Sequence, residues 1–364
     1  EIKMDYAVIM AGGSGQRLWP LSRKNKPKQI INLFNGQSLL RLCVNRISSL
    51  FDPAHILVVT NAEYSDVVHE HLPELPQENI LGEPVGRNTA NAIGLAATVL
   101  SLKDPRCTMA VLSADHIIEP VEPLHNAVKK SIAYLRHHPE ALFTFGIKAA
   151  YAHTGFGYLK RGQEISGTQG IFPVEAFQEK PNKSTASKYI RSGDYCWNSG
   201  IFVWRVDTIL NYLEQFLPQN APRLARIGQE WNTENRSQVL EAEFPRLQSI
   251  SIDYAVMEHA RDVFMCELDC YWSDVGSYQH LADTIGNIDP DNNATTSTTC
   301  VEWIDSTNNI AISESRDHLI AAIGIDDLAI IHTDDATLIC HREEGDNLKG
   351  LIKRLEEKGF ERFL

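Results

Sequence analysis

The sequence of 364 residues contains no apolar run long enough to cross a membrane and no excess of positive charge. A membrane-spanning helix needs about 20 consecutive apolar residues, so we expect no membrane partner. The net charge of −13 argues against nucleic acid as a partner, because a general nucleic-acid binder presents a basic face. An anionic ligand of this chain must therefore be held by local cations or by a metal ion.

Cysteines are few, and their arrangement indicates neither a disulfide framework nor a zinc site. This odd number of scattered residues is typical of reduced thiols, so we expect a cytoplasmic protein. Cys266 and Cys270 lie close together in sequence, but no second pair accompanies them, as a structural zinc site would require. The seven cysteines are Cys43, Cys107, Cys196, Cys266, Cys270, Cys300 and Cys340.

What the chain does contain is an ordinary globular composition, with 43% hydrophobic and 22% charged residues. Its length suits two or three domains. The composition changes at the polar turn 289–293. We therefore expect a larger domain over residues 1–288 and a smaller one over residues 289–364.

The larger domain alternates apolar strand patterns with amphipathic helix patterns. Continuous apolar strands between such helices predict an α/β fold with a mainly parallel sheet that is covered on both faces. We also expect helices to begin at Ser38, Asn88, Ser184, Asp207 and Asp253. The expected strands lie near residues 6–10, 55–60, 108–112, 142–147, 171–178 and 200–205.

The smaller domain consists of short β-type runs followed by one amphipathic helix. The runs lie near residues 300–304, 309–312, 319–323, 329–331 and 338–340. The helix covers residues 348–355, and Gly359 is its expected C-terminal cap. No repeat is long enough to predict an extended β-solenoid.

A glycine-rich loop after the first apolar run carries the strongest chemical signal. Residues 12–15 place three glycines in four positions. Glycines let the backbone turn tightly and bring several N–H groups close to an anion. Because Arg17 and Lys28 add two cations, we expect a triphosphate-binding loop that spreads charge while one phosphate is attacked.

This loop differs from the two best-known phosphate-binding patterns. Leu18 stands where the dinucleotide fingerprint has its third glycine. Arg17 and Leu18 also fall where the Walker pattern has Gly-Lys-Ser/Thr. A glycine loop after a strand can also be only a tight structural turn, and that alternative stays open at this point.

Two aspartates far apart in sequence are candidate ligands for a divalent metal. Asp115 follows the apolar run 108–112, and Asp274 precedes Gly276. Ligands of open α/β sheets gather at the carboxyl ends of strands, where both carboxylates could converge on Mg²⁺ that bridges phosphate oxygens. Each could instead be a capping or turn aspartate.

Polar residues in the middle of the chain are candidates for contact with a sugar phosphate. The expected strand 171–178 ends at Glu179 and Lys180. Lys180 offers a point charge for a phosphate, and Glu179 can accept hydrogen bonds from sugar hydroxyls. Asn198 and Gly157 lie in further expected loops. The same residues could also form a solvated strand end and plain turns.

These motifs resemble one known family. Residues 12–29 closely resemble the signature of the mannose-1-phosphate guanylyltransferases (GDP-mannose pyrophosphorylases). Trp19 and the segment 87–90 favour this branch over the thymidylyl- and uridylyltransferases. Further motifs that resemble the family follow in the same order and with the same spacing along nearly the whole chain. They lie at residues 83–84, 87–90, 113–116, 177–181, 197–200, 251–254, 256–258, 272–276, 324–328 and 333–336.

The resemblance implies a Rossmann-like fold, with a mixed, mainly parallel sheet flanked by helices and a small C-terminal β-rich domain. It implies that residues 1–288 form the catalytic domain and that the chain forms a homodimer. The implied reaction joins GTP and mannose 1-phosphate into GDP-mannose and pyrophosphate, with Mg²⁺ as the cofactor.

The same resemblance implies roles for individual residues. Arg17 and Lys28 are the implied catalytic cations, and Asp115 and Asp274 the implied metal ligands. The residues implied to contact the nucleotide are Ala11, Gly12, Gly13, Ser14, Gly15, Glu83, Asn88 and Thr89, the last three at the guanine. Those implied to contact the sugar phosphate are Gly157, Glu179, Lys180 and Asn198. Gln178 and Asn91 depart from the family pattern, but neither has a charged role.

Other functions compete with this interpretation. A nucleotidyltransferase of other base or sugar specificity would use the same cations and aspartates. A non-catalytic, nucleotide-sugar-binding regulatory subunit would be expected to lack Arg17, Lys28 or the two aspartates, and all four are present. A retaining glycosyltransferase would usually carry an Asp-x-Asp metal motif, and Ser113 stands where its first aspartate would be.

Overall fold

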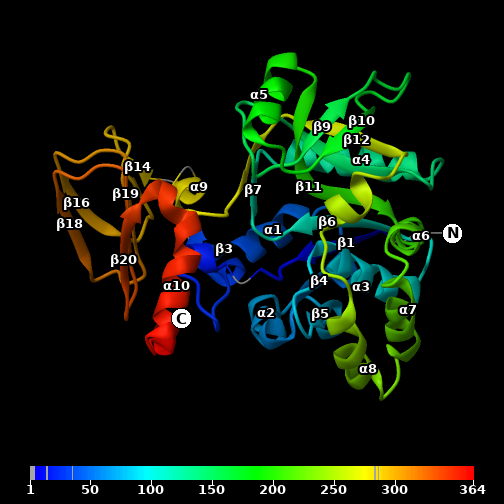
Figure 1. The fold of residues 1–364 in the computed structure, drawn as a ribbon, viewed down its shortest axis with the longest axis horizontal. Helices are drawn as coiled ribbons and strands as arrows, with labels where there is room; N and C mark the ends of the chain where they lie inside the picture. Colours follow the sequence, from blue (N-terminus) through cyan, green and yellow to red (C-terminus); the bar gives the residue numbers. More distant parts are fainter. Residues whose placement is uncertain (1–4, 14, 35, 283, 286) are drawn as a thin grey trace. The chain divides into compact units, whose positions relative to one another are not determined.

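The computed structural model describes residues 5–13, 15–34, 36–282, 284–285 and 287–364, which form two compact units (Figure 1). Unit 1 consists of the residues up to Gly12 together with Arg46–Ser113 and Ile118–Trp272. Unit 2 consists of Gly13–Asn45, Ala114–Ile117 and Ser273–Leu364. Each unit is assembled from separate stretches of the chain, and the predicted domain boundary after residue 288 stays a prediction.

Unit 1 is built around a nine-stranded mixed sheet with the strand order β5-β4-β1-β6-β11-β8-β12-β10-β9. The first four strands in this order are parallel, and β11 is antiparallel to both β6 and β8. The expected mixed α/β sheet is confirmed, but its strand pairing is not mainly parallel, because β9, β10 and β11 form only antiparallel pairs. The strands are β1 (Asp5–Met10), β4 (Ile56–Asn61), β5 (Ile80–Glu83), β6 (Thr108–Ser113), β8 (Leu142–Lys148), β9 (Tyr158–Arg161), β10 (Phe172–Gln178), β11 (Tyr195–Arg205) and β12 (Val263–Leu268).

Helices cover this sheet because its central strands are apolar on both faces. In β1, Tyr6 and Val8 belong to an apolar cluster with α3, α6 and α7, while Ala7 and Ile9 are buried on the other face. No helix in the described part of the chain is long and apolar enough to cross a membrane. The helices of unit 1 are α2 (Ser65–His71), α3 (Thr89–Ser101), α4 (Glu122–Leu135), α5 (Lys183–Ser192), α6 (Val206–Phe216), α7 (Ala221–Glu230) and α8 (Arg236–Glu243).

The carboxyl ends of β1 and β6 lie side by side, with Met10 opposite Ser113 in a parallel register. The glycine loop follows β1 and Asp115 follows β6. These two candidate segments therefore leave the sheet from neighbouring strands, as expected for ligand-binding segments of an open α/β sheet.

Three predicted helix starts differ from the structure. α5 begins at Lys183 rather than Ser184, because Asn182 is its N-cap. Asp207 lies inside the first turn of α6, where its carboxylate accepts a hydrogen bond from the Thr208 N–H at 2.8 Å, and the helix begins at Val206. Asp253 does not cap an α-helix, because Asp253–Met257 forms a single π-helical turn. Such turns occur frequently at functional sites.

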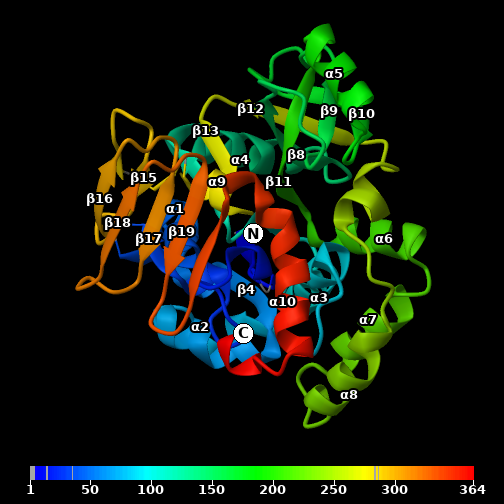
Figure 2. The same ribbon diagram turned by 60° about the vertical axis from the view of Figure 1, so that its left-hand side comes forward.

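Unit 2 packs the stretch after the glycine loop against the C-terminal strands around one apolar cluster. Leu18 and Trp19 share this cluster with Tyr278, Ile331 and Ile352. The Tyr278 hydroxyl donates to the Leu18 and Trp19 carbonyls at 2.8 and 3.0 Å. Figure 2 shows α10 beside the C-terminal strands of this unit. Its elements are β2 (Asn32–Phe34), β3 (Gln37–Ser38), α9 (Tyr278–Ala282), β14 (Asn287–Ile288), β15 (Ala294–Thr295), β16 (Cys300–Ile304), β17 (Ile310–Ser313), β18 (Leu319–Ile323), β19 (Leu328–His332), β20 (Thr337–His341) and α10 (Leu348–Glu357).

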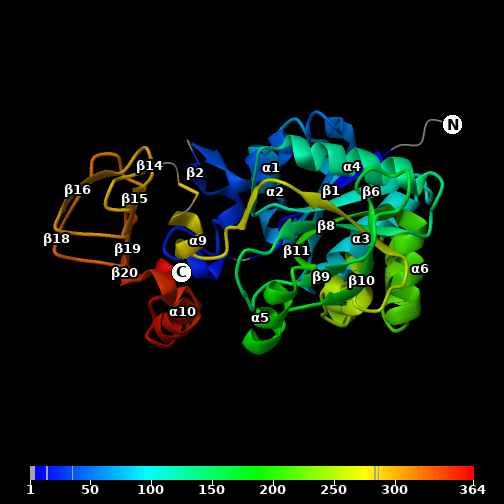
Figure 3. The same cartoon turned by 90° about the horizontal axis from the view of Figure 1, so that it is seen from above.

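The C-terminal strands coil, because β15, β17 and β19 pair in parallel and β16 pairs in parallel with β18. Figure 3 shows β16 and β18 on one side of the coil and β15, β19 and β20 on the other. Buried asparagines join successive turns: the Asn309 amide donates to the Asn293 side chain at 2.9 Å, and Asn309 accepts from the Leu328 N–H at 2.9 Å. The sequence predicts the strands but not the coil, because these contacts span unequal separations of 16 and 19 residues.

Three further elements lie where the chain passes from one unit to the other. They are α1 (Leu39–Ile47), β7 (His116–Glu119) and β13 (Tyr271–Asp274). β7 and β13 pair with each other.

Candidate active site

Unit 2 gathers four predicted residues, Arg17, Lys28, Asp115 and Asp274, which we call the lysine–aspartate cluster. The Lys28 ammonium donates to the Asp115 carboxylate and, at 3.3 Å, to the Val275 carbonyl. The Val275 N–H donates to the Asp115 carbonyl at 3.0 Å. The residue after Asp274 is thus fixed against Asp115, although the two aspartates are far apart in sequence.

Arg17 joins this cluster through Gly276. A Cβ added to Gly276 would lie 3.7 Å from both Arg17 Nη1 and Asp274 Oδ2. The side chains of Lys28 and Asp115 are 11% and 22% exposed, and that of Asp274 is 36% exposed. Lys28, Asp115 and Asp274 are therefore partly buried, Arg17 is exposed, and the cluster remains accessible to a ligand.

The donor set of this cluster suits a magnesium ion. Asp115 and Asp274 supply two carboxylates, and Asp274 Oδ1 also lies 3.1 Å from His280 Nδ1. No group of three or more His, Cys, Asp or Glu side chains in the described residues is arranged to hold a metal by itself. Mg²⁺ usually binds one or two carboxylates and completes its shell with phosphate oxygens and water. Asp115 and Asp274 therefore fit Mg²⁺ better than a fully protein-ligated metal.

The glycine loop is shaped by close neighbours on both sides. Gly15 has a φ of +65°, and a Cβ there would lie 2.6 Å from the Lys28 Cβ, so this position requires glycine. The Gly13 carbonyl accepts from the Gln29 side-chain amide at 2.9 Å. The Ala11 N–H donates to the Val59 carbonyl at 2.7 Å, so it is already bonded to β4. Ser14, another predicted contact, lies outside the described residues.

Glu83, at the end of β5, is a buried carboxyl beside the start of the glycine loop. A Cβ added to Gly12 would lie 3.2 Å from Glu83 Oε2. Glu83 is 4% exposed, and its Oε1 has no hydrogen-bond partner in the described part of the chain. Burial raises the pKa of this carboxyl to about 7. An unpartnered buried acid is costly unless a ligand satisfies it.

Asn88 and Thr89 stand at the N-terminus of α3, where the sequence predicted a helix start. The Asn88 side chain accepts from the Thr89 N–H at 2.8 Å, and Asn88 has a φ of +67°. The Thr89 hydroxyl accepts from the Ile252 N–H at 2.9 Å. Both side chains therefore already make bonds within unit 1.

Unit 1 gathers Gly157, Glu179, Lys180 and Asn198, which we call the glutamate–asparagine cluster. The Asn198 N–H donates to the Gly157 carbonyl at 2.8 Å. A Cβ added to Gly157 would overlap the Glu179 carboxylate and lie 3.3 Å from the Asn198 Cβ. Glu179 is 8% exposed, whereas the Lys180 side chain is 54% exposed with its Nζ 3.2 Å from Glu179 Oε1. The structure thus brings all four predicted residues together.

Two acids behind this cluster were not predicted as site residues from the sequence. Asp253 Oδ1 accepts from the Asn198 side-chain amide at 3.0 Å, and Glu258 Oε1 accepts from the Glu179 N–H at 2.8 Å. Burial raises the pKa of Asp253 to about 7, and the Glu179 carboxylate adds to this shift. Burial also raises the pKa of Glu179, although Lys180 opposes it. The motif 251–258 was recognised in the sequence, but nothing local indicated that its acids face Glu179 and Asn198.

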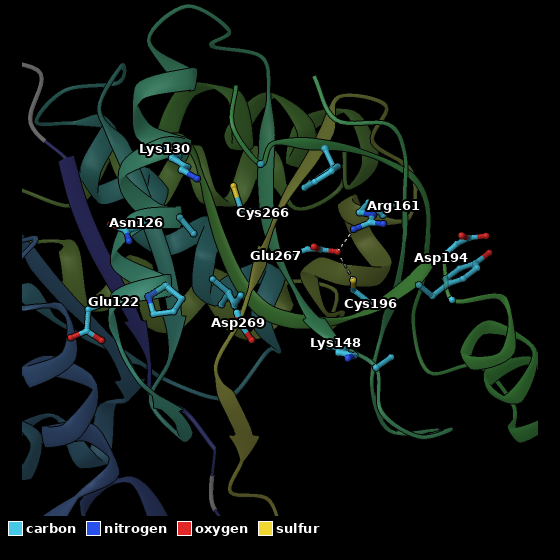
Figure 4. A pocket seen from close by; sticks show the side chains of 18 of the residues that line it. Glu122, Asn126, Lys130, Lys148, Arg161, Asp194, Cys196, Cys266, Glu267 and Asp269 are labelled. Atoms are coloured by element: carbon cyan, nitrogen blue, oxygen red, sulfur yellow. Dashed lines mark hydrogen bonds and ion pairs between the residues drawn. The ribbon is translucent and has the colours of Figure 1, made fainter. Parts of the chain in front are cut away.

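A cavity of about 960 Å³ lies elsewhere in unit 1, between α4, β9, β11 and β12 (Figure 4). None of the predicted site residues lines it. Two of its three cations are bonded within the chain: Arg161 pairs with Glu267 at 2.6 Å, and Lys130 donates to the Gln169 carbonyl at 2.6 Å. Acidic and basic side chains line the cavity together, so its charge does not identify a ligand.

Known proteins resemble this chain along its whole length. Residues 6–289 match a family model described as nucleotidyl transferase, and residues 301–355 match one described as MannoseP isomerase/GMP-like beta-helix domain. The chain is 36% identical to mannose-1-phosphate guanylyltransferases from Escherichia coli and from Klebsiella pneumoniae, in each case over 96% of this chain and 74% of the relative.

A solved structure from Thermus thermophilus, described as a mannose-1-phosphate geranyltransferase, shares this fold. It superposes with a TM-score of 0.84 at 28% identity and covers 97% of this chain and 99% of its own. The β-helix match agrees with the parallel coil observed in unit 2.

Proposed function

The chain belongs to the family of mannose-1-phosphate guanylyltransferases, and we propose that it joins GTP and mannose 1-phosphate into GDP-mannose and pyrophosphate. The observation that carries this proposal is the lysine–aspartate cluster, where Lys28 and Arg17 gather with two aspartates from distant parts of the chain. Such a group of charges suits a polyphosphate with a divalent metal.

The proposed reaction is a direct in-line transfer. An oxygen of the sugar phosphate attacks the α-phosphorus of GTP, a new P–O bond forms, and the bond to pyrophosphate breaks. A phosphate nucleophile is mostly dianionic near neutral pH, so no general base is required. Lys28 and Arg17 stabilise the negative charge that develops on the phosphoryl oxygens. Catalysis then depends mainly on positioning and electrostatics.

We assign Asp115 and Asp274 to Mg²⁺. When bound, the ion would neutralise negative charge on the phosphates. Lys28 pairs with Asp115 in the structure described here. Because its flexible side chain carries a point charge, the same ammonium can turn to a phosphate oxygen when the carboxylate ligates the metal.

We assign the glutamate–asparagine cluster to mannose 1-phosphate. Glu179 accepts hydrogen bonds from sugar hydroxyls, Asn198 donates one, and Gly157 lets the ring approach the backbone. Lys180 binds the sugar phosphate with its exposed ammonium. Lys180 has a φ of +44°, which is uncommon for a residue with a side chain. Such backbone strain clusters at functional sites.

We assign Glu83 to the guanine base, with Asn88 and Thr89 beside it. An ionised carboxylate accepts two hydrogen bonds from the N–H groups on the Watson–Crick edge of guanine. Such donors favour the ionised form and lower the raised pKa of Glu83 when the base is bound. Adenine presents an acceptor at the matching ring position, which the ionised carboxylate repels.

A substrate panel tests this function. Pyrophosphate release is measured with GTP, ITP, ATP, UTP and dTTP against mannose 1-phosphate and glucose 1-phosphate, with Mg²⁺ and with a chelator. We expect the highest kcat/KM for GTP with mannose 1-phosphate and loss of activity in the chelator. ITP lacks the 2-amino group of guanine, so the GTP-to-ITP ratio reports the contact with Glu83.

Other outcomes of the panel separate the alternatives. Faster turnover of another nucleotide or sugar phosphate would identify a nucleotidyltransferase of different specificity. Binding of GDP-mannose without pyrophosphate release from any pair would identify a non-catalytic regulatory subunit.

We propose that the chain is a homodimer that uses the outer face of β16 and β18. Leu319, Ile323 and Ile304 are 62%, 69% and 49% exposed on this face, and Ile304 is paired with Ile323. Contiguous exposed apolar side chains mark interaction surfaces. The variant Leu319→Glu/Ile323→Glu should sediment as a monomer where the natural chain sediments as a dimer. Identical sedimentation of the two proteins would rule out this face.

We propose the cytoplasm as the working compartment, because no cysteine in the described residues is paired in a disulfide. Free thiols persist in reducing compartments. Subcellular fractionation tests this: recovery of the protein from an oxidising compartment would contradict the proposal.

A further inference from the structure

The side-chain amide of Asn198 is held in one orientation by hydrogen bonds at both of its ends. Its Oδ1 accepts from the Thr144 hydroxyl at 2.7 Å and from the Gly200 N–H at 3.3 Å, while its Nδ2 donates to Asp253 Oδ1 at 3.0 Å. The Gly200 N–H can only donate, so it fixes which end of the amide carries the oxygen, and the ionised form of Asp253 accepts at the other end. Asn198 is therefore left with one N–H hydrogen, and no other strong group, to offer a ligand.

The acid that fixes this orientation comes from a turn that also holds Glu179. Asp253 opens the π-helical turn Asp253–Met257, and Glu258 follows directly. Glu258 accepts from the Glu179 N–H at 2.8 Å. Residues 253–258 thus contact both Glu179 and Asn198.

The segment that contains this π-helical turn is also hydrogen-bonded to the start of α3. The Ile252 N–H donates to the Thr89 hydroxyl at 2.9 Å, and the Ala90 N–H donates to the Ile250 carbonyl at 3.2 Å. The Asn91 side-chain amide donates to the Gln248 carbonyl at 2.7 Å. The segment 248–258 is therefore held at several points, and Asp253 is presented from a rigid support.

We propose that Asp253 is a positioning residue for sugar recognition, which holds the Asn198 amide so that an N–H donor, beside the Glu179 acceptor, faces the substrate. A donor next to an acceptor matches two neighbouring hydroxyls of a hexose, one accepting from Asn198 and one donating to Glu179. This inference rests on the proposed assignment of Glu179 and Asn198 to the sugar phosphate.

Steady-state kinetics of Asp253→Ala and Asp253→Asn, with both substrates varied, test the proposal. We expect Asp253→Ala to raise KM for mannose 1-phosphate by about tenfold or more, and KM for GTP by less than about twofold. Asp253→Asn keeps an oxygen that can accept from Asn198, so its KM should stay within about threefold of the natural value. Tyr254→Phe, at an exposed neighbour on the same turn, is the matched control and should leave both KM values unchanged.

A double-mutant cycle shows whether Asp253 acts through Asn198. In an Asn198→Ala background, the further change Asp253→Ala should raise the sugar-phosphate KM by less than about twofold, since the group that it positions is already absent. Fully additive effects of the two substitutions, or an equal rise in KM for GTP, would overturn the proposal.

An exchange of the two side chains separates positioning from stability and does not depend on the folding of Asp253→Ala. The variant Asn198→Asp/Asp253→Asn restores an amide–carboxylate hydrogen bond in the reverse direction, but position 198 no longer carries a donor. We expect a near-natural melting temperature and a sugar-phosphate KM that remains raised by about tenfold. Recovery of the natural KM in this exchange would refute the role of the donor.

The failure of this inference can be told from failure of the site assignment. If Asn198→Ala leaves the sugar-phosphate KM unchanged, the assignment of Asn198 to the sugar is wrong. If Asn198→Ala raises that KM and Asp253→Ala does not, the assignment stands and the positioning role of Asp253 is wrong.

Discussion

The glutamate–asparagine cluster of unit 1 and the lysine–aspartate cluster of unit 2 are held by different kinds of interaction. In the first, Asn198 accepts a hydrogen bond from Thr144 and donates one to Asp253, and the Glu179 N–H donates to Glu258, all within unit 1. In the second, oppositely charged side chains face each other, with Lys28 against Asp115. The first cluster is prepared for a neutral ring, and the second for a highly charged ligand.

The kind of interaction determines how each cluster can respond to its substrate. Hydrogen bonds to these half-buried acids fix the direction of the amide, because breaking them leaves polar groups unpaired where access of water is limited. Ion pairs between partly exposed side chains are exchanged more readily, since solvent and ligand compete for the same charges. We therefore expect rigid recognition of the sugar and rearrangement of charged side chains around the triphosphate.

Removal of Lys28 should produce the largest effect on the charged cluster. Lys28→Ala should lower kcat by roughly a hundredfold or more, equivalent to about 2.7–4 kcal/mol of transition-state stabilisation, with the fold retained. Kinetics and circular dichroism measure the two parts of this prediction.

Lys26→Ala is the matched control for Lys28, because Lys26 forms only a surface ion pair with Glu314 at 2.5 Å. It should change kcat by less than about threefold. Near-natural turnover of Lys28→Ala would remove Lys28 from the mechanism.

The buried acid Glu83 should make the stability of the unliganded protein depend on pH. Its pKa is raised from 4.5 to about 7 in the folded chain, so between these values only the folded state holds the proton. The stabilisation is full below pH 4.5 and is lost as pH rises through 7. It amounts to roughly 3 kcal/mol at most.

Unfolding of Glu83→Gln and the natural chain from about pH 4 to about pH 8 measures this dependence. The stability of the natural chain relative to the variant should decline with rising pH. Glu78→Gln, at an exposed glutamate before the same strand, should run parallel to the natural chain. A constant difference between Glu83→Gln and the natural chain would contradict the prediction.

A pair of glycine substitutions compares the two clusters directly. Gly157→Ala places a Cβ on the Glu179 carboxylate, whereas Gly276→Ala places one at an ordinary contact distance of 3.7 Å from Arg17 and Asp274. Gly157→Ala should raise KM for mannose 1-phosphate by about tenfold, and Gly276→Ala should change each KM by less than about twofold. Equal kinetic effects of the two variants would contradict the view that the glutamate–asparagine cluster is rigid and the lysine–aspartate cluster adaptable.

The smallest expected effect concerns the support of the glycine-loop segment in unit 2. Tyr278→Phe removes the hydroxyl that bonds the Leu18 and Trp19 carbonyls. We expect the free energy of unfolding to fall by about 1 kcal/mol, with kcat nearly unchanged. Thermal and urea unfolding measure it, and Tyr254→Phe serves as the exposed control. A large loss of kcat in Tyr278→Phe would mean that this support also sets the position of Arg17.

Local patterns predicted most of the fold. Apolar runs such as 108–112 and 142–147 became β6 and β8, and Ser38 does accept from the Arg41 N–H at the start of α1. The coil of unit 2 was not predicted, because its turns have unequal lengths and its asparagine contacts join distant positions. The packing of Trp19 against C-terminal residues was not predicted either, since no local pattern encodes such a contact.

Sequence motifs predicted the members of both clusters, whereas the residues that support them, such as Asp253, are identified only by the structure. The residue types and spacing of these motifs already indicate their chemical roles, as for Lys28, Asp115, Glu179 and Asn198. Asp253 was expected to cap a helix, because a carboxylate before an apolar segment is a common capping pattern. Its bond to Asn198 depends on the path of the chain through unit 1, which spacing alone does not give.

The packing of Trp19 in unit 2 also bears on how such proteins evolve by recombination. Leu18, Trp19 and Ile31 fill the same apolar cluster as Ile310 and Ile331 of the coil. If a gene segment encoding only the coil were transferred to another protein, the apolar side chains of the coil that pack against Leu18, Trp19 and Ile31 would be exposed. They would be buried again only if the recipient had an equivalent apolar stretch after its own glycine loop. We expect the two segments to be inherited together, and we do not expect the coil to be transferred between proteins on its own.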